Sequence, residues 1–188
     1  MRIKIEQIIR ADIAVKRQLL KTQVKKIAMA ADIIIASLKK GGKVILFGNG
    51  GSAADAQHIA AELIGRFQKD RKAIAALALT TNTSILTAIA NDYGYEHTFK
   101  RQIEGLAGKN DVAIGISTSG NADNVIEAVK LANKLGLNTI GLTGAGGGRL
   151  AKTAKLSIIA PSKSTPRIQE SHIVIGHIIC ELVEDALR

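Results

Sequence analysis

The chain has 188 residues, 46% of them hydrophobic and 22% charged, which is typical of one globular domain and excludes a disordered chain. A single cysteine, Cys180, excludes a disulfide framework and a cysteine-rich zinc fold, and we expect it in the core. The formal net charge is +10, but seven of these charges fall in the first 40 residues and aromatic residues are only 3%, so a nucleic-acid partner is not expected.

Residues 4–40 are predicted to be helical. Their apolar residues recur at spacings of three, four and seven and so share one face; they are Ile5, Ile9, Ile13, Leu20, Val24, Ile27, Ala31, Ile34 and Leu38. Thr22 and Gln23 mark a place where the segment could divide into two helices. Because the apolar face must be buried, we expect a partner subunit to cover it. The lysines opposite are interpreted as a solvated face, with docking of an acidic partner as the alternative.

From Gly41 onward, short apolar runs alternate with helical patterns. The runs predict strands at Lys43–Phe47, Ala73–Leu79, Asp111–Ile116, Asn138–Leu142 and Lys155–Ala160. The helical patterns cover Ser52–Arg66, Thr83–Ala90, His97–Leu106, Asn121–Leu135 and about Arg167 to Leu187. This alternation indicates βαβ units. The predicted fold class is therefore α/β, a doubly wound five-stranded parallel sheet flanked by helices, with an N-terminal helical extension.

One domain is expected over residues 1–188, with an extension at 1–40 that contacts other subunits and an α/β body at 41–188. The apolar runs are too short to span a bilayer, so no membrane association is expected. The first residues interleave charges with apolar side chains and show no secretory signal. The expected location is cytoplasmic.

Ligands of such sheets bind beyond the carboxyl ends of the strands, so a site is expected in the loops from strand to helix. Two loops have the composition of an anion site, Gly48–Ser52 (GNGGS) after the first strand and Ser117–Asn121 (STSGN) after the third. Glycines let the backbone approach a ligand, and N–H groups at a helix start attract an anion. Together the loops predict a cradle for one phosphate and the polyol attached to it.

The two loops also have other interpretations. The first fits the dinucleotide pattern G-x-G-x-x-A, and Asp70 lies about twenty residues further on, but this interpretation leaves the Ser/Thr loop unused. The absence of a G-x-x-x-x-G-K-[ST] run argues against a nucleoside triphosphatase of the Walker type. Ordinary turn chemistry at strand ends is the structural alternative for the pair.

The helix after the first loop carries His58 and Glu62, which are four residues apart and share one face. In the final helix, Gln169 and His177 are eight apart, a spacing that permits shared ligation without requiring it. Imidazole and carboxyl groups are usual zinc ligands, and a glutamine carbonyl is a rarer one. A satisfied core histidine is the alternative for His58, and we expect His172 in the core.

In chain order, these motifs resemble the phosphoheptose isomerase family of the SIS sugar-isomerase group. The matching segments are Gly48–Ser52, His58-x-x-x-Glu62, Asn91-Asp92, Ser117–Asn121 and Arg167-Ile168-Gln169-Glu170-x-His172. The resemblance runs across nearly the whole chain. It implies an SIS-type fold and a cytoplasmic homotetramer with one zinc ion, Zn2+, per subunit.

The resemblance also implies conversion of a phosphorylated seven-carbon sugar, D-sedoheptulose 7-phosphate, into D-glycero-D-manno-heptose 7-phosphate. This is the first step towards the activated heptose of bacterial surface glycans such as lipopolysaccharide. The implied metal ligands are His58, Glu62, Gln169 and His177. The expected substrate contacts are Asn49, Gly50, Gly51, Ser52, Glu62, Asn91, Asp92, Ser117, Thr118, Ser119 and Gln169.

Moving a carbonyl from C2 to C1 through an enediol requires a base at carbon and an acid at oxygen. We expect Glu62 to be the base, His177 the acid, and Asp92 a candidate for opening the sugar ring. Two positions depart from the family. Ala122 stands where many members have a serine, so one hydroxyl donor is missing. Pro166 stands at a variable position, so no acidic role is carried over to it, and it suits the first turn of a helix.

Two functions without catalysis compete with the isomerase. A related protein that binds the replication initiator DnaA shares the run Leu86–Asp92, and a sugar-phosphate-sensing SIS module is the third possibility. In the DnaA-binding relative, the positions that match Glu62 and His177 are not Glu and His. Their presence here favours the enzyme.

Overall fold

The structure, a computed structural model, describes residues 1–187, and the predicted domain end at Arg188 lies outside them. The helices are α1 (Arg2–Thr22), α2 (Val24–Lys39), α3 (Gly51–Ile64), α4 (Thr83–Tyr93), the 3-10 turn η1 (Tyr95–His97), α5 (Thr98–Leu106), α6 (Asp123–Lys134), α7 (Gly148–Thr153) and α8 (Thr165–Ala186). The strands are β1 (Val44–Gly48), β2 (Ala76–Ala78), β3 (Val112–Ser117), β4 (Asn138–Thr143) and β5 (Leu156–Ile159). Strands and helices alternate from β1 onward, as predicted.

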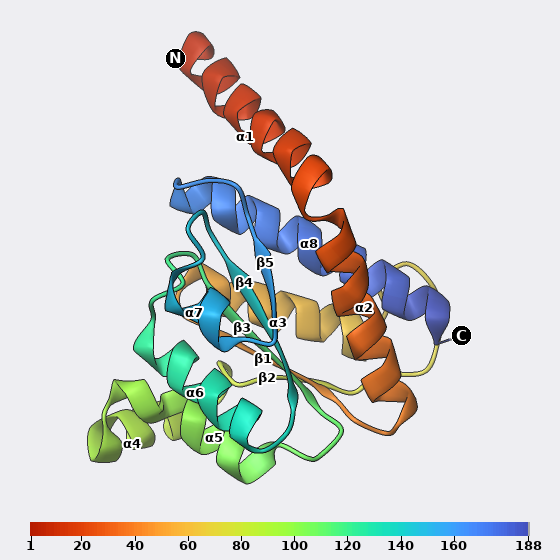
Figure 1. Ribbon diagram of the computed structural model, residues 1–188, viewed down its shortest axis with the longest axis vertical. Helices are drawn as coiled ribbons and strands as arrows, with labels where there is room; N and C mark the ends of the chain where they lie inside the picture. The colour runs from red at the N-terminus through yellow and green to blue at the C-terminus, as the bar shows by residue number, and fades with distance from the viewer. Residues whose placement is uncertain (188) are drawn as a thin grey trace.

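Within residues 1–187, the strands form one parallel five-stranded sheet in the order β2-β1-β3-β4-β5 (Figure 1). This confirms the predicted fold class. Strand β2 pairs with one edge of β1. The chain then crosses to the other edge of β1, where β3, β4 and β5 follow in order. Gly48 at the end of β1 lies in register with Ile116 of β3. The loops that follow these two strands therefore meet where the strand order reverses, which is the usual ligand site of such sheets.

Helices cover both faces of the sheet (Figure 1). On one face, α2, α3 and α8 pack in a core cluster that contains Leu46 and Ile114. On the other face, α5, α6 and α7 pack around Ile45 and Phe47. The side chains of successive residues in β1 thus pack into the cores on opposite faces of the sheet. This is why its sequence is a continuous apolar run, as expected for a parallel sheet buried on both sides.

The N-terminal segment divides at Gln23, the residue between α1 and α2. In α2 the apolar stripe is buried from Ile27 to Ile34, and these two residues are at most 5% exposed. In α1 it is uncovered, since Ile5 and Ile9 are 50% and 54% exposed. Figure 1 shows α1 projecting away from the body of the molecule. The prediction of a buried stripe therefore holds within this chain only for its second half.

The remaining differences from the predicted elements are small. The short helix α7 was not predicted, because its six residues follow a run of glycines and are too few to show a helical period. Pro166 occupies the first turn of α8, as expected. His172 and Cys180 are at most 1% exposed, which confirms their placement in the core. Across residues 1–187, we find no helix of the length and apolar character that crossing a membrane requires.

Candidate functional site

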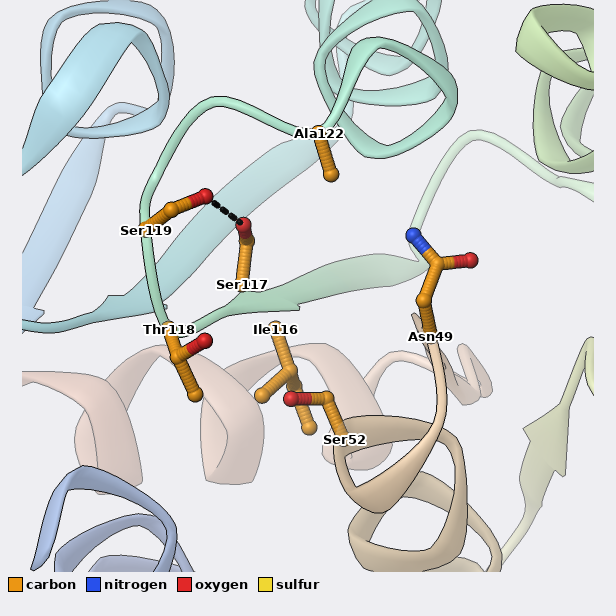
Figure 2. Close-up of a pocket in the computed structure, with 7 residues that line it drawn as sticks. All are labelled: Asn49, Ser52, Ile116, Ser117, Thr118, Ser119 and Ala122. Carbon is orange, nitrogen blue, oxygen red and sulfur yellow. Dashed lines mark hydrogen bonds between the residues drawn. The ribbon is translucent and has the colours of Figure 1, made fainter. Parts of the chain in front are cut away.

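A polar cavity lies at the carboxyl ends of β1 and β3, where the strand order reverses (Figure 2). Its lining comes from the two loops singled out in the sequence and from the strand and helix next to them: Asn49, Ser52, Ile116, Ser117, Thr118, Ser119 and Ala122. Five of the eleven predicted substrate contacts are thereby brought together: Asn49, Ser52, Ser117, Thr118 and Ser119. Figure 2 shows Ala122 across the cavity from Ser52, so this part of the rim presents a methyl group without a hydroxyl donor.

The cavity offers hydrogen-bond donors and no positive side chain among its lining residues. The Ser119 hydroxyl accepts from the Asn121 amide at 3.1 Å and lies 3.5 Å from the hydroxyl of Ser117. Helix α3 opens beside the cavity with no hydrogen bond from a capping side chain. The N–H groups of Ser52 and Ala53 in its first turn donate to the carbonyls of Asn49 and Gly50 at 3.0 Å, so the attraction for an anion comes from the positive end of the helix dipole.

The orientation of the Asn49 amide is fixed by a hydrogen-bond network. Asn49 Oδ1 accepts from Asn124 Nδ2 at 2.9 Å and from the Tyr95 hydroxyl at 3.0 Å, while Asn49 Nδ2 donates to Asn124 Oδ1 at 2.9 Å. The backbone N–H of Val125 also donates to Asn124 Oδ1, which settles which atom of Asn124 is the acceptor. Both acceptor positions of Asn49 are therefore used, and it is left with one N–H for a ligand. Asn124 and Tyr95 carried no recognisable signal in the sequence.

Three titratable side chains converge between α3 and α8. Nε2 of His58 lies 3.1 Å from Oε1 of Glu62 and 3.1 Å from Nε2 of His177. The ligand atoms of all three residues lie within 4.8 Å of one another. His58 is exposed and the other two side chains are half-buried, so the cluster can be reached from solvent. The spacing of His58 and Glu62 predicted that they share a face of α3. The structure shows that His177 of α8 lies against this face.

Close packing of the two helices brings this cluster together. Gly176 precedes His177 on α8, and a Cβ at this position would lie 2.6 Å from Cδ1 of Ile59, the residue after His58 on α3. Only glycine therefore permits this helix separation without a shift of Ile59. The contact between Gly176 and Ile59 sets the two imidazoles opposite each other, with ring centroids 5.0 Å apart.

The cluster fits a zinc-like divalent metal. Two nitrogen ligands of a tetrahedral zinc site, each bound at about 2.0–2.1 Å, lie about 3.3 Å apart, close to the 3.1 Å between the two Nε2 atoms. Two imidazoles and one carboxylate are also a donor set that zinc commonly takes. His58 is exposed, so it is not a satisfied core histidine.

Gln169, the fourth expected ligand, lies against the start of α3. Its side chain packs on Gly51 in the first turn of α3, where an added Cβ would lie 2.2 Å from Gln169 Nε2. Any side chain at position 51 would therefore displace Gln169. From Gly51 to His58 the helix rises about 10 Å, so Gln169 and the cluster contact the same helix less than two turns apart. Ligation by the Gln169 carbonyl stays a prediction.

Asp55, which was not predicted, lies one turn before His58 on α3. Its Oδ2 atom is buried with no hydrogen-bond partner in the described part of the chain. Burial raises the pKa of the Asp55 carboxyl to about 6, and the nearby charge of His58 opposes this shift. Its i, i+3 spacing from His58 could have identified it, because such pairs share a helix face.

Asn91 and Asp92 lie on the exposed side of α4, where Asn91 Nδ2 donates to Asp92 Oδ1 at 2.8 Å. Neither residue lines the polar cavity. Figure 1 shows α4 at the edge of the molecule, next to α5 and on the other side of the sheet from α8. Their roles in substrate binding and ring opening stay predictions.

Comparison with known proteins gives a consistent result. Residues 9–144 match the SIS domain family. The chain is 55% identical over 182 residues to the phosphoheptose isomerase of Aquifex aeolicus, covering 97% of this chain and 95% of that protein. The phosphoheptose isomerase GmhA from Neisseria gonorrhoeae superposes with a TM-score of 0.93 at 42% identity, over 98% of each chain. The phosphoheptose isomerase from Francisella tularensis gives 0.94 at 33% identity, over 97% of each chain.

Proposed function

Because the chain belongs to the phosphoheptose isomerase family of SIS-domain proteins, we propose that Glu62 and His177 carry out the proton transfers of an aldose–ketose isomerisation. The reaction converts D-sedoheptulose 7-phosphate into D-glycero-D-manno-heptose 7-phosphate. The assignment of residues rests on one observation. His177 on α8 meets His58 and Glu62 on α3, the helix that opens beside the polar cavity. The cavity would hold the sugar phosphate and the cluster its reacting end.

In this mechanism Glu62 removes the proton from C1 of the ketose and returns it to C2 after the enediol has formed. One oxygen of its carboxylate faces His58, so the other can face the substrate. His177 moves the proton between the two sugar oxygens. An imidazole has two ring nitrogens, so binding a metal through one leaves the other to hold a proton. Both steps are ordinary general acid–base catalysis.

We propose that His58, Glu62, His177 and Gln169 hold one zinc ion. The two imidazole nitrogens and the carboxylate oxygen support this proposal by their spacing and their chemistry. Zinc bound there supplies a positive charge that stabilises developing negative charge on the sugar oxygens.

We also propose the cytoplasm as the place of reaction, since a phosphorylated sugar does not cross an apolar membrane freely.

The isomerase is favoured over a DnaA-binding protein or a sugar-phosphate sensor. The relatives at 51–57% identity are named phosphoheptose isomerase. A binding protein also has no need for a carboxylate and two imidazoles that meet beside a polar cavity. The proximity of Glu62 and His177 to His58 is the feature that distinguishes the three functions.

Turnover of D-sedoheptulose 7-phosphate in deuterated water tests the proposal. We expect D-glycero-D-manno-heptose 7-phosphate that carries deuterium at C2, because the proton held by Glu62 exchanges with solvent before it returns to carbon. Mass spectrometry and proton NMR of the product measure both results. Failure to form the aldoheptose would contradict the isomerase, whereas an unlabelled aldoheptose would contradict exchange of the transferred proton with solvent at Glu62.

We further propose a homotetramer in which other subunits cover the exposed part of the N-terminal stripe. The support is an apolar groove between α1, α2 and α8, lined by Lys16, Leu19, Leu20, Val24, Ile27, Val174 and Ile178. Leu20 and Val24 on its rim are 70% and 52% exposed. Apolar surface of this kind marks interaction sites, and closed symmetric assemblies are the rule for soluble oligomers.

Light scattering is expected to give a mass close to four times 19.9 kDa for the wild type. The double variant Leu20→Glu/Val24→Glu should give a smaller species, because each charge would have to be buried in the interface. Lys21→Glu changes a charge on the same turn outside the groove lining and should leave the mass unchanged. A wild type that runs as a single chain would refute the assembly.

A further inference from the structure

A buried ion pair that the proposed chemistry does not use lies close to the site. Nε of Arg71 donates to Oε1 of Glu184 at 3.1 Å, and the two side chains are only 5% and 1% exposed. Arg71 lies in the segment between α3 and β2, and Glu184 lies on α8, seven residues after His177. Seven residues are about two helical turns, so Glu184 and His177 lie on the same face of α8.

The carboxylate of Glu184 is surrounded by donors from the segment after α3. Oε1 accepts from the Phe67 amide at 3.0 Å, and Oε2 accepts from the Gln68 and Lys69 amides at 2.9 and 3.0 Å. Burial alone would raise the pKa of the Glu184 carboxyl, but these N–H groups and the charge of Arg71 outweigh burial and lower the pKa. Glu184 is therefore a buried anion that holds three consecutive backbone amides.

The guanidinium of Arg71 closes the C-terminus of α3. Its Nη2 donates to the carbonyl of Glu62 at 2.8 Å, and its Nη1 donates to the carbonyls of Leu63 and Gly65 at 2.8 and 3.2 Å. The last carbonyls of a helix lack partners within the helix, and a cation there also interacts favourably with the helix dipole. Gly65 does not form the usual left-handed cap, since its φ is −75°. Arg71 thus caps α3, and one of the carbonyls that it binds belongs to Glu62, the proposed base.

The same segment also contacts the other side of the site. The ring of Phe67 packs against the imidazole of His177, with centroids 5.4 Å apart. The Phe67 amide is one of the groups held by Glu184. Arg71 and Glu184 therefore fix the backbone of Glu62 on α3 and the side-chain packing of His177 on α8 at the same time.

We propose that Arg71 and Glu184 are positioning residues that set the separation of Glu62 and His177. This inference rests on the proposed function for its catalytic consequence, but the geometry it predicts does not. Neither residue lines the polar cavity, so substrate binding should depend on them little. The expected signature is loss of turnover and of metal affinity with little change in KM.

Glu184→Gln tests the proposal with almost no change of side-chain shape. We expect kcat to fall at least about tenfold, KM to stay within about threefold, and the dissociation constant for Co²⁺ to rise at least about tenfold, as for supporting partners of metal ligands. The matched control is Asp185→Asn, which alters the exposed pair of Asp185 with Lys69, 2.5 Å apart, on the same helix and segment. Its kcat and Co²⁺ affinity should match the wild type.

Arg71→Lys is the second variant, and it replaces Glu184→Gln if that protein does not fold. It keeps the buried positive charge but loses the fork of guanidinium donors. A folded Glu184→Gln or Arg71→Lys protein with the turnover and Co²⁺ affinity of the wild type would overturn the proposal. Co²⁺ absorption requires no turnover, so an altered cobalt site in a protein without isomerase activity would support the positioning role while refuting the proposed function.

Discussion

Glu62→Gln is expected to lower kcat/KM about 10³-fold. An amide cannot accept a proton from carbon, and a positioned general base contributes about 10² to 10⁴ in rate. The substitution preserves the shape of a side chain that lies 3.1 Å from His58 and is 25% exposed, so folding should be little affected. The measurement is aldoheptose formation together with deuterium exchange at C1 of the ketose, since loss of the base should abolish both.

Glu104→Gln is the matched control for this prediction. Glu104 is an exposed glutamate on α5 that pairs with Arg101 at 3.2 Å, and the change from carboxylate to amide is the same. We expect wild-type rates from it. If Glu62→Gln exchanges the C1 proton as fast as the wild type does, another residue is the base and Glu62 acts only as a ligand.

Removal of the metal is expected to lower both activity and thermal stability, and Zn²⁺ should restore both. A ligand present at 100 times its dissociation constant stabilises the folded state by about 2.7 kcal/mol. For a domain of this size, that corresponds to a fall of about 5–10 °C in Tm. Calorimetry before and after chelation, with the metal content verified by elemental analysis, measures this difference.

His58→Ala should abolish the response to chelation, because it removes the ligand whose Nε2 faces both Glu62 and His177. His97→Ala is the control, since His97 lies at the end of η1 with its nearest carboxylate, Glu96, 3.9 Å away. It should keep both the metal and the response. An unchanged Tm and rate in wild-type protein shown to be metal-free would reject the zinc assignment.

Local patterns in the sequence were sufficient for the fold class and for half of the site. The apolar runs predicted all the strands of the sheet in residues 1–187, because burial on both faces leaves its mark on consecutive residues. The glycine and hydroxyl loops were found because residues that shape a turn are neighbours in the chain. His58 and Glu62 could be placed together from their spacing alone, since a helix fixes the angle between residues four apart.

Only the tertiary structure decided which distant side chains join them. The spacing of Gln169 and His177 left shared ligation open, and the close contact of Gly176 with Ile59 brought His177 to the cluster. Arg71 and Glu184 are separated by 113 residues and gave no local signal. The physical reason is that periodicity reports which face of an element is apolar, whereas the packing of one element on another determines which polar groups meet at their edges.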